Sequence, residues 1–473
     1  MAVDCMQINC YIQRMGFEKS LDQREESRNF FKSLFTIVGP IALQNLISAA
    51  VGSADVIMLG KVGQDAIAAV NLASYIQFIL FLFFIGLSSG VVMLAAQYWG
   101  KKDTHSIETI FGIGCKISAA IGLVFALSAF FVPGLLMKIF TDELPLISIG
   151  SEYLRFVSVG FFILAFSQIY QAVLKSIERV RTVTVITTAA LLLNIGLNAV
   201  FIYGLFGMPK LGVRGVALAT TISRVIELLV CVFVCARVRE IHFGLETLFR
   251  KNAVLLRDFV HYSLPAIGNE AVWGAGWATY AVIMGHLGSD LVAANSVVNV
   301  VRNLASVLCF GMAYGGAIVL GKQMGANQME LVSRNASRLV KSTILAGAAG
   351  AVALGLCRPL IFRIADLNEQ ARFYLTPLLY INCLSLFGAA INTVLICGVF
   401  RAGGDAKWGF VLDAIAMWAV SVPLGFFCAF VLHLPPLVVY LILYVDEWEK
   451  MIFNVIHYKR GKWMKNITRD FES

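Results

Sequence analysis

Four carboxylates interrupt stretches of the chain that are otherwise almost free of charge, and they are Asp55, Glu227, Glu270 and Asp413. In a bilayer, a charged side chain at the centre of a helix costs about 2.5–3.5 kcal/mol on insertion scales, so such residues tend to be functional. A carboxylate in an apolar cavity can load and release a proton, because burial favours its uncharged form. It can also attract an organic cation, and nearby aromatic rings strengthen that attraction.

The elements that carry these carboxylates are long apolar runs. The chain has 473 residues, of which 59% are hydrophobic and 14% are charged, whereas a soluble domain is near half apolar and about a quarter charged. A spanning helix needs about 20 mostly apolar residues. The runs that qualify are 34–60, 70–97, 107–132, 150–174, 183–206, 212–236, 262–287, 294–321, 335–358, 373–400, 408–431 and 435–457. We therefore predict an all-α polytopic membrane protein with twelve transmembrane helices.

The two halves of the chain are related by an internal repeat. Residues 60–69 align without a gap on residues 285–294, at an offset of 225. Further along the chain the offset becomes 226, which pairs Lys175 with Arg401. Each half then contributes six helices, so both lobes have the same orientation in the membrane and can enclose a central cavity.

The repeat and the distribution of charge predict how the chain is organised. The predicted segments are an N-terminal segment 1–33, an N-lobe 34–237, a linker 238–258, a C-lobe 259–458 and a tail 459–473. Both terminal segments and every second loop together hold most of the 38 Lys and Arg residues. By the positive-inside rule, both termini lie in the cytoplasm. The net charge of +9 therefore reflects orientation in a cell (plasma or inner) membrane, and we predict no nucleic-acid partner.

Four short motifs occur in a fixed order along the chain, namely ADVIMLGKVG at 54–63, NIGLN at 194–198, LGVRGVALAT at 211–220 and RAGGD at 401–405. With the duplication, they resemble the multidrug and toxic compound extrusion (MATE) family, in its bacterial NorM-like and DinF-like forms. The resemblance extends over residues 34–465. It implies a monomeric secondary antiporter that needs no cofactor and expels small organic, often cationic compounds in exchange for H⁺ or Na⁺.

A stripe of polar or small residues on the first helix is the first predicted site. Gln44, Ser48, Gly52 and Asp55 follow one another at spacings of four, four and three, which places them on one helical face. With Asn45, this stripe would line the interior of the N-lobe. The family resemblance places a coupling carboxylate at Asp55. The alternative is a structural Asp near the outer surface of the membrane.

The resemblance adds Asn194, Asn198 and Thr220 to the predicted cation-coupling site. In archaeal relatives an Asp occupies the second of these places, so Asn198 leaves the cluster one carboxylate short. The alternative for all three residues is hydrogen bonding between helices.

In the C-lobe, Trp273 follows Glu270 by close to one turn, and Asp413 begins a similar face with Trp418 nearby. A carboxylate beside aromatic rings suits an organic cation, so we predict that Glu270, Trp273 and Asp413 contact substrate. Packing in the core or against lipid is the alternative for the tryptophan, and a place at the cytoplasmic boundary is the alternative for Asp413.

The predicted tenth helix, 373–400, contains no Asp or Glu. NorM-like relatives have an acidic residue there, so its absence favours H⁺ over Na⁺ as the coupling ion. A Na⁺ ion near Asp55 or Glu270 is left open, and no other metal is predicted.

Two further patterns receive structural interpretations. Glu227 lies three residues after Arg224 on one helix, which predicts an ion pair. Residues 86–90 (GLSSG) fit the GxSxG nucleophile pattern, but that pattern needs a strand–turn–helix, and the second half reads GMAYG at 311–315. The recurring glycines therefore predict close helix packing. The chain contains no Walker A motif or catalytic set, and we predict that it is not an enzyme.

Other functions remain open from the sequence. One is a flippase for lipid-linked precursors, or a dedicated metabolite exporter, of the same superfamily. Arg302 is the only Arg well within helices seven to nine that could contact a phosphate. The remaining alternative is an intramembrane enzyme or a receptor.

Overall fold

The computed structural model describes residues 2–60, 62–364 and 367–470, and within them the side chains of residues 2–23, 53, 55–57, 245 and 364 are not described. The described chain is helical and has no strand. The N-lobe helices are α1 (Ala2–Leu59), α2 (Gln64–Lys101), α3 (Thr104–Phe131), α5 (Leu144–Ser176), α6 (Val180–Tyr203) and α7 (Val213–Ala236). Short helices α4 (Pro133–Lys138), η1 (Leu205–Gly207) and α8 (Leu245–Phe249) lie in its connections and in the linker.

The C-lobe repeats this order with interruptions. Its first three helices are α9 (Ala253–His286), α10 (Ser289–Gly325) and α11 (Met329–Leu356), and the short α12 (Arg358–Ile364) follows. The fourth is α13 (Glu369–Thr393) continued by the π-helix η2 (Val394–Phe400). The fifth comprises α14 (Ala406–Asp413), the π-helix η3 (Ala414–Ser421) and α15 (Val422–Phe430), and the sixth comprises α16 (Pro436–Leu443) and α17 (Asp446–Lys459).

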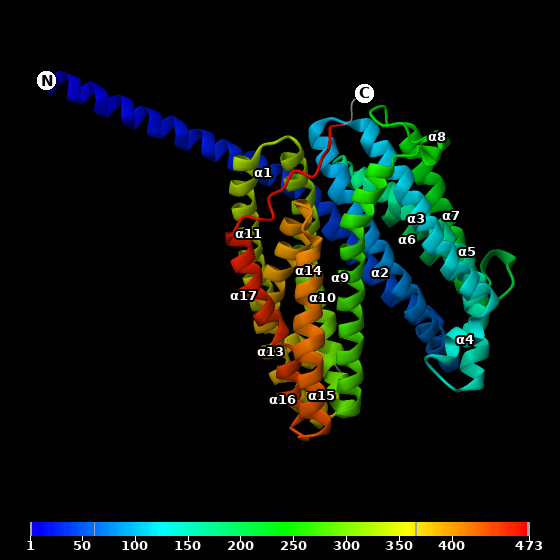
Figure 1. The fold of residues 1–473 in the computed structure, drawn as a ribbon. Helices are drawn as coiled ribbons and strands as arrows, with labels where there is room; N and C mark the ends of the chain where they lie inside the picture. The colour runs from blue at the N-terminus through cyan, green and yellow to red at the C-terminus, as the bar shows by residue number, and fades with distance from the viewer. Residues whose placement is uncertain (1, 61, 365–366, 471–473) are drawn as a thin grey trace.

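The architecture confirms the predicted twelve-helix, two-lobed fold. Ten helices among the described residues are long and apolar enough to cross a membrane. The other two crossings are α9 and the α16–α17 pair. Both chain ends lie at the same end of the bundle, which we call the terminal end (Figure 1), as an even number of crossings requires.

The backbone repeats at the same offsets as the sequence. Positive φ angles recur in three pairs of turns, at Gly63 (148°) and Gly288 (128°), at Lys102 (64°) and Asn327 (58°), and at Glu178 (64°) and Gly404 (79°). The first two pairs are 225 residues apart and the third is 226 apart. The two lobes are therefore built on one backbone plan.

The change of offset is located within the fourth helix of the C-lobe. α5 begins at Leu144 and α13 begins at Glu369, still 225 residues apart, whereas the turns that follow these helices are 226 apart. A π-helix holds more residues per turn than an α-helix, and it is frequent at functional sites. The extra residue of the C-lobe is thus accommodated in η2, while the equivalent helix α5 is continuous.

The first helix of each lobe crosses from one lobe to the other. In α1, Phe30 and Ile41 belong to a hydrophobic core cluster made mainly of C-lobe residues, while Leu59 belongs to an N-lobe cluster. In α9, Phe259 packs in an N-lobe cluster and Met284 in a C-lobe cluster. Pro40 and Pro265, which the repeat aligns, lie inside these two helices.

Glycines allow the lobes to meet, as the recurring glycines predicted. On α2, a Cβ at Gly86 would overlap the backbone of Ile267, and one at Gly90 would overlap Ser263, both on α9. At the terminal end, a Cβ at Gly100 would overlap the carbonyl oxygen of Lys322 on α10. The helices of the two lobes lie together at this end and diverge toward the opposite end (Figure 1).

The C-terminal tail joins the lobes at the terminal end. The Gln97 side chain of α2 accepts a hydrogen bond from the Ile467 amide (2.8 Å) and donates one to the Lys465 carbonyl (3.1 Å). Arg469 forms two hydrogen bonds with Asp258 of α9, at 2.5 and 2.8 Å. This charged partner raises the pKa of the Arg469 guanidinium above its usual value. The tail thus fastens the terminal end from outside the helix bundle.

Candidate functional site

The structure brings together the three polar residues predicted beside Asp55. Asn194 and Asn198 lie one turn apart on α6, and Asn198 Nδ2 donates to Asn194 Oδ1 at 3.4 Å. Asn194 Nδ2 in turn donates to the Thr220 hydroxyl of α7, also at 3.4 Å. Both asparagines are buried. The three residues form one interhelical polar cluster, and their role in coupling stays a prediction.

The other members of the N-lobe site lie on α1. Asp55 is in this helix, but its side chain lies outside the described residues. Ser48 is exposed and donates a hydrogen bond to the Gln44 carbonyl at 2.9 Å. Gln44 and Asn45 are half-buried, and Gln44 Oε1 is buried without a hydrogen-bond partner among the described residues. Since α1 packs against α6, the stripe and the asparagine cluster belong to the same lobe surface.

The C-lobe contains a buried network of charges that was only partly predicted. Arg401, which the sequence placed in a loop, is 2% exposed at the end of η2. Its guanidinium donates to Glu270 Oε1 at 2.8 Å and to Asn269 Oδ1 at 2.6 Å. Glu270 is therefore paired with a cation of the protein, and its contact with an organic cation stays a prediction.

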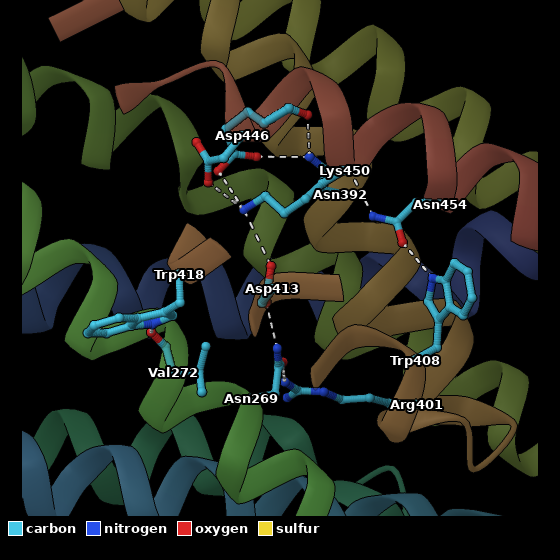
Figure 2. Close-up of polar contacts among 11 residues, drawn as sticks. Asn269, Val272, Asn392, Arg401, Trp408, Asp413, Trp418, Asp446, Lys450 and Asn454 are labelled. Atoms are coloured by element: carbon cyan, nitrogen blue, oxygen red, sulfur yellow. Dashed lines mark hydrogen bonds and ion pairs between the residues drawn. The ribbon is translucent and has the colours of Figure 1, made fainter. Parts of the chain in front are cut away.

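Asp413 continues this network toward the last helix. Its Oδ2 accepts a hydrogen bond from Asn269 at 2.5 Å, and its Oδ1 lies 3.4 Å from Lys450 Nζ. Figure 2 shows Asn269 between Arg401 and Asp413, and Lys450 beyond Asp413. Asp413 is buried in the interior of the lobe, and its predicted contact with substrate stays a prediction.

Lys450 lies among three carboxylates on α14 and α17. Its Nζ is 2.9 Å from Asp446 and 3.5 Å from Glu447, in addition to its contact with Asp413. Glu447 also accepts a hydrogen bond from Asn392 at 2.9 Å. These side chains are all buried. We call Glu270, Arg401, Asp413, Asp446, Glu447 and Lys450 the C-lobe network.

The expectation that only four acidic residues lie well inside the spans was therefore wrong. Asp446 and Glu447 fall within the predicted twelfth span, and the sequence DEWEK at 446–450 was the signal. The span is broken between α16 and α17, and Asp446 and Glu447 occupy the first turn of α17. Carboxylates are favoured at a helix N-terminus by the helix dipole, so the break helps to accommodate them inside the membrane.

The aromatic residues near Glu270 hold a cation that the protein itself supplies. The Arg302 guanidinium lies 4.6 Å from the ring centroid of Trp277 and 5.2 Å from that of Tyr444, within the range of a cation–π contact. Trp273 packs edge-on against Trp277 at 6.0 Å. On η3, Trp418 donates to the Val272 carbonyl at 3.1 Å. Whether Trp273 contacts substrate stays a prediction.

The two structural interpretations of sequence patterns are confirmed. Glu227 is buried and lies 2.7 Å from Arg224, and it accepts a hydrogen bond from Gln171 at 2.8 Å. Residues 86–90 lie within the continuous helix α2, which provides no strand–turn–helix for a nucleophile. Within the described part of the chain, no group of three or more His, Cys, Asp or Glu side chains could hold a metal ion.

Comparison with known proteins agrees with this fold. The family model MatE matches twice, at residues 40–200 and 267–427, once in each lobe. An uncharacterized transporter of Bacillus subtilis, YisQ, is 25% identical over 439 residues, which cover 92% of this chain and 95% of YisQ. A probable multidrug resistance protein of Rhizobium meliloti, NorM, is 26% identical over 423 residues and covers 86% of this chain and 87% of NorM.

Solved structures share the fold at low sequence identity. A MATE crystal structure in a bent conformation superposes with a TM-score of 0.83 at 17% identity, covering 92% of this chain and 96% of that one. A transporter of the MOP superfamily from Pyrococcus furiosus gives a TM-score of 0.81 at 18% identity, covering 91% and 95%. The family model covers well over half of the chain. The chain therefore belongs to the MatE family of multidrug efflux transporters, and it is a multi-pass membrane transporter and not an enzyme.

Proposed function

We propose that this protein exports small organic, often cationic compounds from the cytoplasm by antiport, and that H⁺ is the coupling ion. The observation that carries the proposal is the relation between the lobes: two six-helix halves share one backbone plan, and glycines bring helices of the two halves close together in the middle of α2 and at the terminal end. Such a pair can rock about a central site and expose it to each side of the membrane in turn.

The positive-inside rule assigns the terminal end to the cytoplasm. Gly100 packs against Lys322 there, and Gly325 of α10 packs in turn against Gln97 of α2. The state described is then closed to the cytoplasm. In this state substrate leaves and the coupling ion enters from outside.

Coupling by H⁺ is supported by the composition of the N-lobe site. The residues that the family resemblance places beside Asp55 are Asn194, Asn198 and Thr220, which are neutral. Na⁺ prefers several oxygen ligands with compensating charge, whereas a proton needs a single carboxylate. Proton binding at Asp55 would change how α1 packs against α6, which links the ion to the position of the lobe.

The proposal is tested by transport in proteoliposomes that contain the purified protein. A panel of cationic dyes is loaded, and a pH gradient and a Na⁺ gradient are applied separately. We expect efflux to follow the pH gradient and to be unaffected by the Na⁺ gradient. Efflux that responds only to Na⁺ would reverse the choice of ion, and dye movement that responds to neither gradient would contradict antiport.

A further inference from the structure

We propose that the C-lobe network is a second coupling site, which exchanges one proton, and that Lys450 serves there as a fixed cation. This inference rests on the proposed antiport and adds to it the place in the C-lobe where substrate and proton compete. It concerns residues of α9, η2, α14 and α17 and is independent of Asp55.

The charges of the network do not balance. It holds four carboxylates and two cations, Arg401 and Lys450, and all six residues are at most 8% exposed. Arg302 is the next cation, and its Nη1 lies 3.4 Å from the Tyr444 hydroxyl beside the network. When Arg302 is counted together with Arg401 and Lys450, the four carboxylates leave one net negative charge. Burying an uncompensated charge is costly, so the network is neutral when it has taken up one proton.

The geometry gives the proton a defined place. The Lys450 ammonium has three N–H donors and lies within 3.5 Å of Asp413, Asp446 and Glu447. Glu447 has a second donor in Asn392, and Asp413 has one in Asn269. Asp446 has Lys450 as its described partner. A proton on Asp413 or Asp446 would therefore leave both Glu447 and the Glu270–Arg401 pair in place.

The helices are irregular where they carry the network, which is an independent sign of function. Asp413 immediately precedes the π-helix η3, and Arg401 immediately follows the π-helix η2. The sixth helix is broken directly before Asp446. In the N-lobe the equivalent helices α5 and α6 are continuous. At an offset of 226, Asp413 corresponds to Thr187, so the repeat has a carboxylate at this position in the C-lobe and not in the N-lobe.

The network is connected to the surface between the lobes. Arg401 Nη1 donates to the Ser89 hydroxyl of α2 at 3.1 Å, while Nη2 of the same side chain holds Glu270 and Asn269. A change of charge at Asp413 therefore reaches the N-lobe through Asn269 and Arg401. The other titratable groups that face the network from neighbouring residues are Tyr280, Tyr314, Cys397, Tyr440 and Tyr444.

Competition between proton and substrate follows from this arrangement. With the proton the network is neutral, and without it the network carries one negative charge. An organic cation binds more tightly beside the unprotonated, negatively charged network, because opposite charges attract more strongly in a low-dielectric interior. By linkage, the cation then lowers the affinity for the proton by the same factor. Mutual exclusion of this kind is what antiport requires.

The first measurement is the pH dependence of substrate binding by the purified wild-type protein in detergent. Tetraphenylphosphonium is the probe. Where binding displaces one proton, the apparent Kd falls about tenfold for each unit rise in pH. Proton release is counted independently in weak buffer with a pH indicator.

The carboxylates are tested with Asp413→Asn and Asp446→Asn, each of which keeps the shape of the side chain. We expect at least one of the two to reduce proton release by more than half and to flatten the pH dependence to less than threefold per unit. Glu227→Gln, which removes a buried carboxylate of the N-lobe, is the matched control and should keep the wild-type slope. Size-exclusion chromatography confirms that each variant is folded.

The fixed cation is tested with Lys450→Met and Lys450→Arg. Without the ammonium, the unprotonated network carries two net negative charges in place of one, so protons bind more tightly. The pH at which substrate binding is half-maximal should rise by more than one unit in Lys450→Met. Lys450→Arg should return this midpoint to within half a pH unit of the wild-type value. Lys116→Met, in α3 of the N-lobe, is the control for loss of a lysine from a span.

Wild-type proton release and slope in both Asp variants, or an unchanged midpoint in Lys450→Met, would overturn the inference. If the wild-type protein nevertheless transports dye along a pH gradient, the proposed antiport stands and its proton site lies elsewhere. If the wild-type protein shows no such transport, the proposed function itself fails.

Discussion

Arg401 of the C-lobe donates a hydrogen bond to the Ser89 hydroxyl of the N-lobe at 3.1 Å. The same guanidinium pairs with Glu270 on its other side. One buried cation thus contacts both lobes at the level where α2 and α9 are closely packed. Any motion that separates the lobes has to break this contact.

Removal of the Ser89 hydroxyl should weaken the closed terminal end. We expect Ser89→Ala to shift the equilibrium toward the inward-open state by about 1 kcal/mol, the net contribution of an ordinary hydrogen bond. Distances between spin labels on the terminal ends of α2 and α10 report the two populations. Ser74→Ala is the control, because that hydroxyl bonds within α2 to the Val70 carbonyl at 2.7 Å. An unchanged population in Ser89→Ala would mean that the contact does not hold the lobes.

A larger residue at Gly325 should prevent closure at the terminal end. A Cβ at this position would overlap the backbone of Gln97, and backbone cannot move aside as a flexible side chain can. Gly325→Leu should populate mainly the inward-open state in the same spin-label measurement and should reduce efflux severely. Gly285→Leu is the control, since nothing lies within 4 Å of a Cβ there. A closed state in Gly325→Leu would contradict the packing described.

Asp55→Asn tests the predicted role of the first helix. We expect efflux driven by a pH gradient to fall at least tenfold, because an amide cannot load a proton at neutral pH, while binding of the dye at equilibrium is retained. Asp65→Asn, at the exposed start of α2, should behave as wild type. Undiminished efflux that still follows the pH gradient would remove Asp55 from the mechanism.

Loss of Trp463 should destabilise the protein through its tail. The side chain is 1% exposed and stacks on Tyr458 at 5.7 Å. Trp463→Ala should lower the free energy of unfolding by roughly 3–5 kcal/mol, as for other fully buried aromatic residues. Thermal unfolding in detergent measures the change. Trp448→Ala should cost clearly less, because that side chain is 37% exposed, and equal losses would argue against a structural tail.

The Arg224–Glu227 pair should behave as a structural element. Glu227→Ala alone should cost roughly 3–5 kcal/mol of stability, because it leaves a partly buried guanidinium unpaired. Replacing both residues by Met should recover most of that loss. The comparison is made by thermal unfolding of the two single variants and the double variant. A double variant as unstable as the sum of the single ones would show that the two residues do not interact.

The sequence determined the membrane class, the helix number and the two-lobed plan. These features depend on the length of apolar runs and on residues that recur at a fixed offset, such as Gly63 and Gly288, and both are local properties of the chain. The pairing of Glu227 with Arg224 could also be predicted from the sequence, because residues three apart share a helical face. The asparagine cluster followed from the same spacing together with the family resemblance.

Only the tertiary structure decided the composition of the C-lobe network. Glu270 and Arg401 are 131 residues apart, and no local rule pairs them. One extra residue in a π-helix rotates the side chains that follow by about 100°, the angle per residue of an α-helix. Through this rotation, a charged residue that the sequence places in a loop can face the buried side of a helix, as Arg401 does. The partners of a buried charge depend on which faces of distant helices meet, and that is a property of the folded chain.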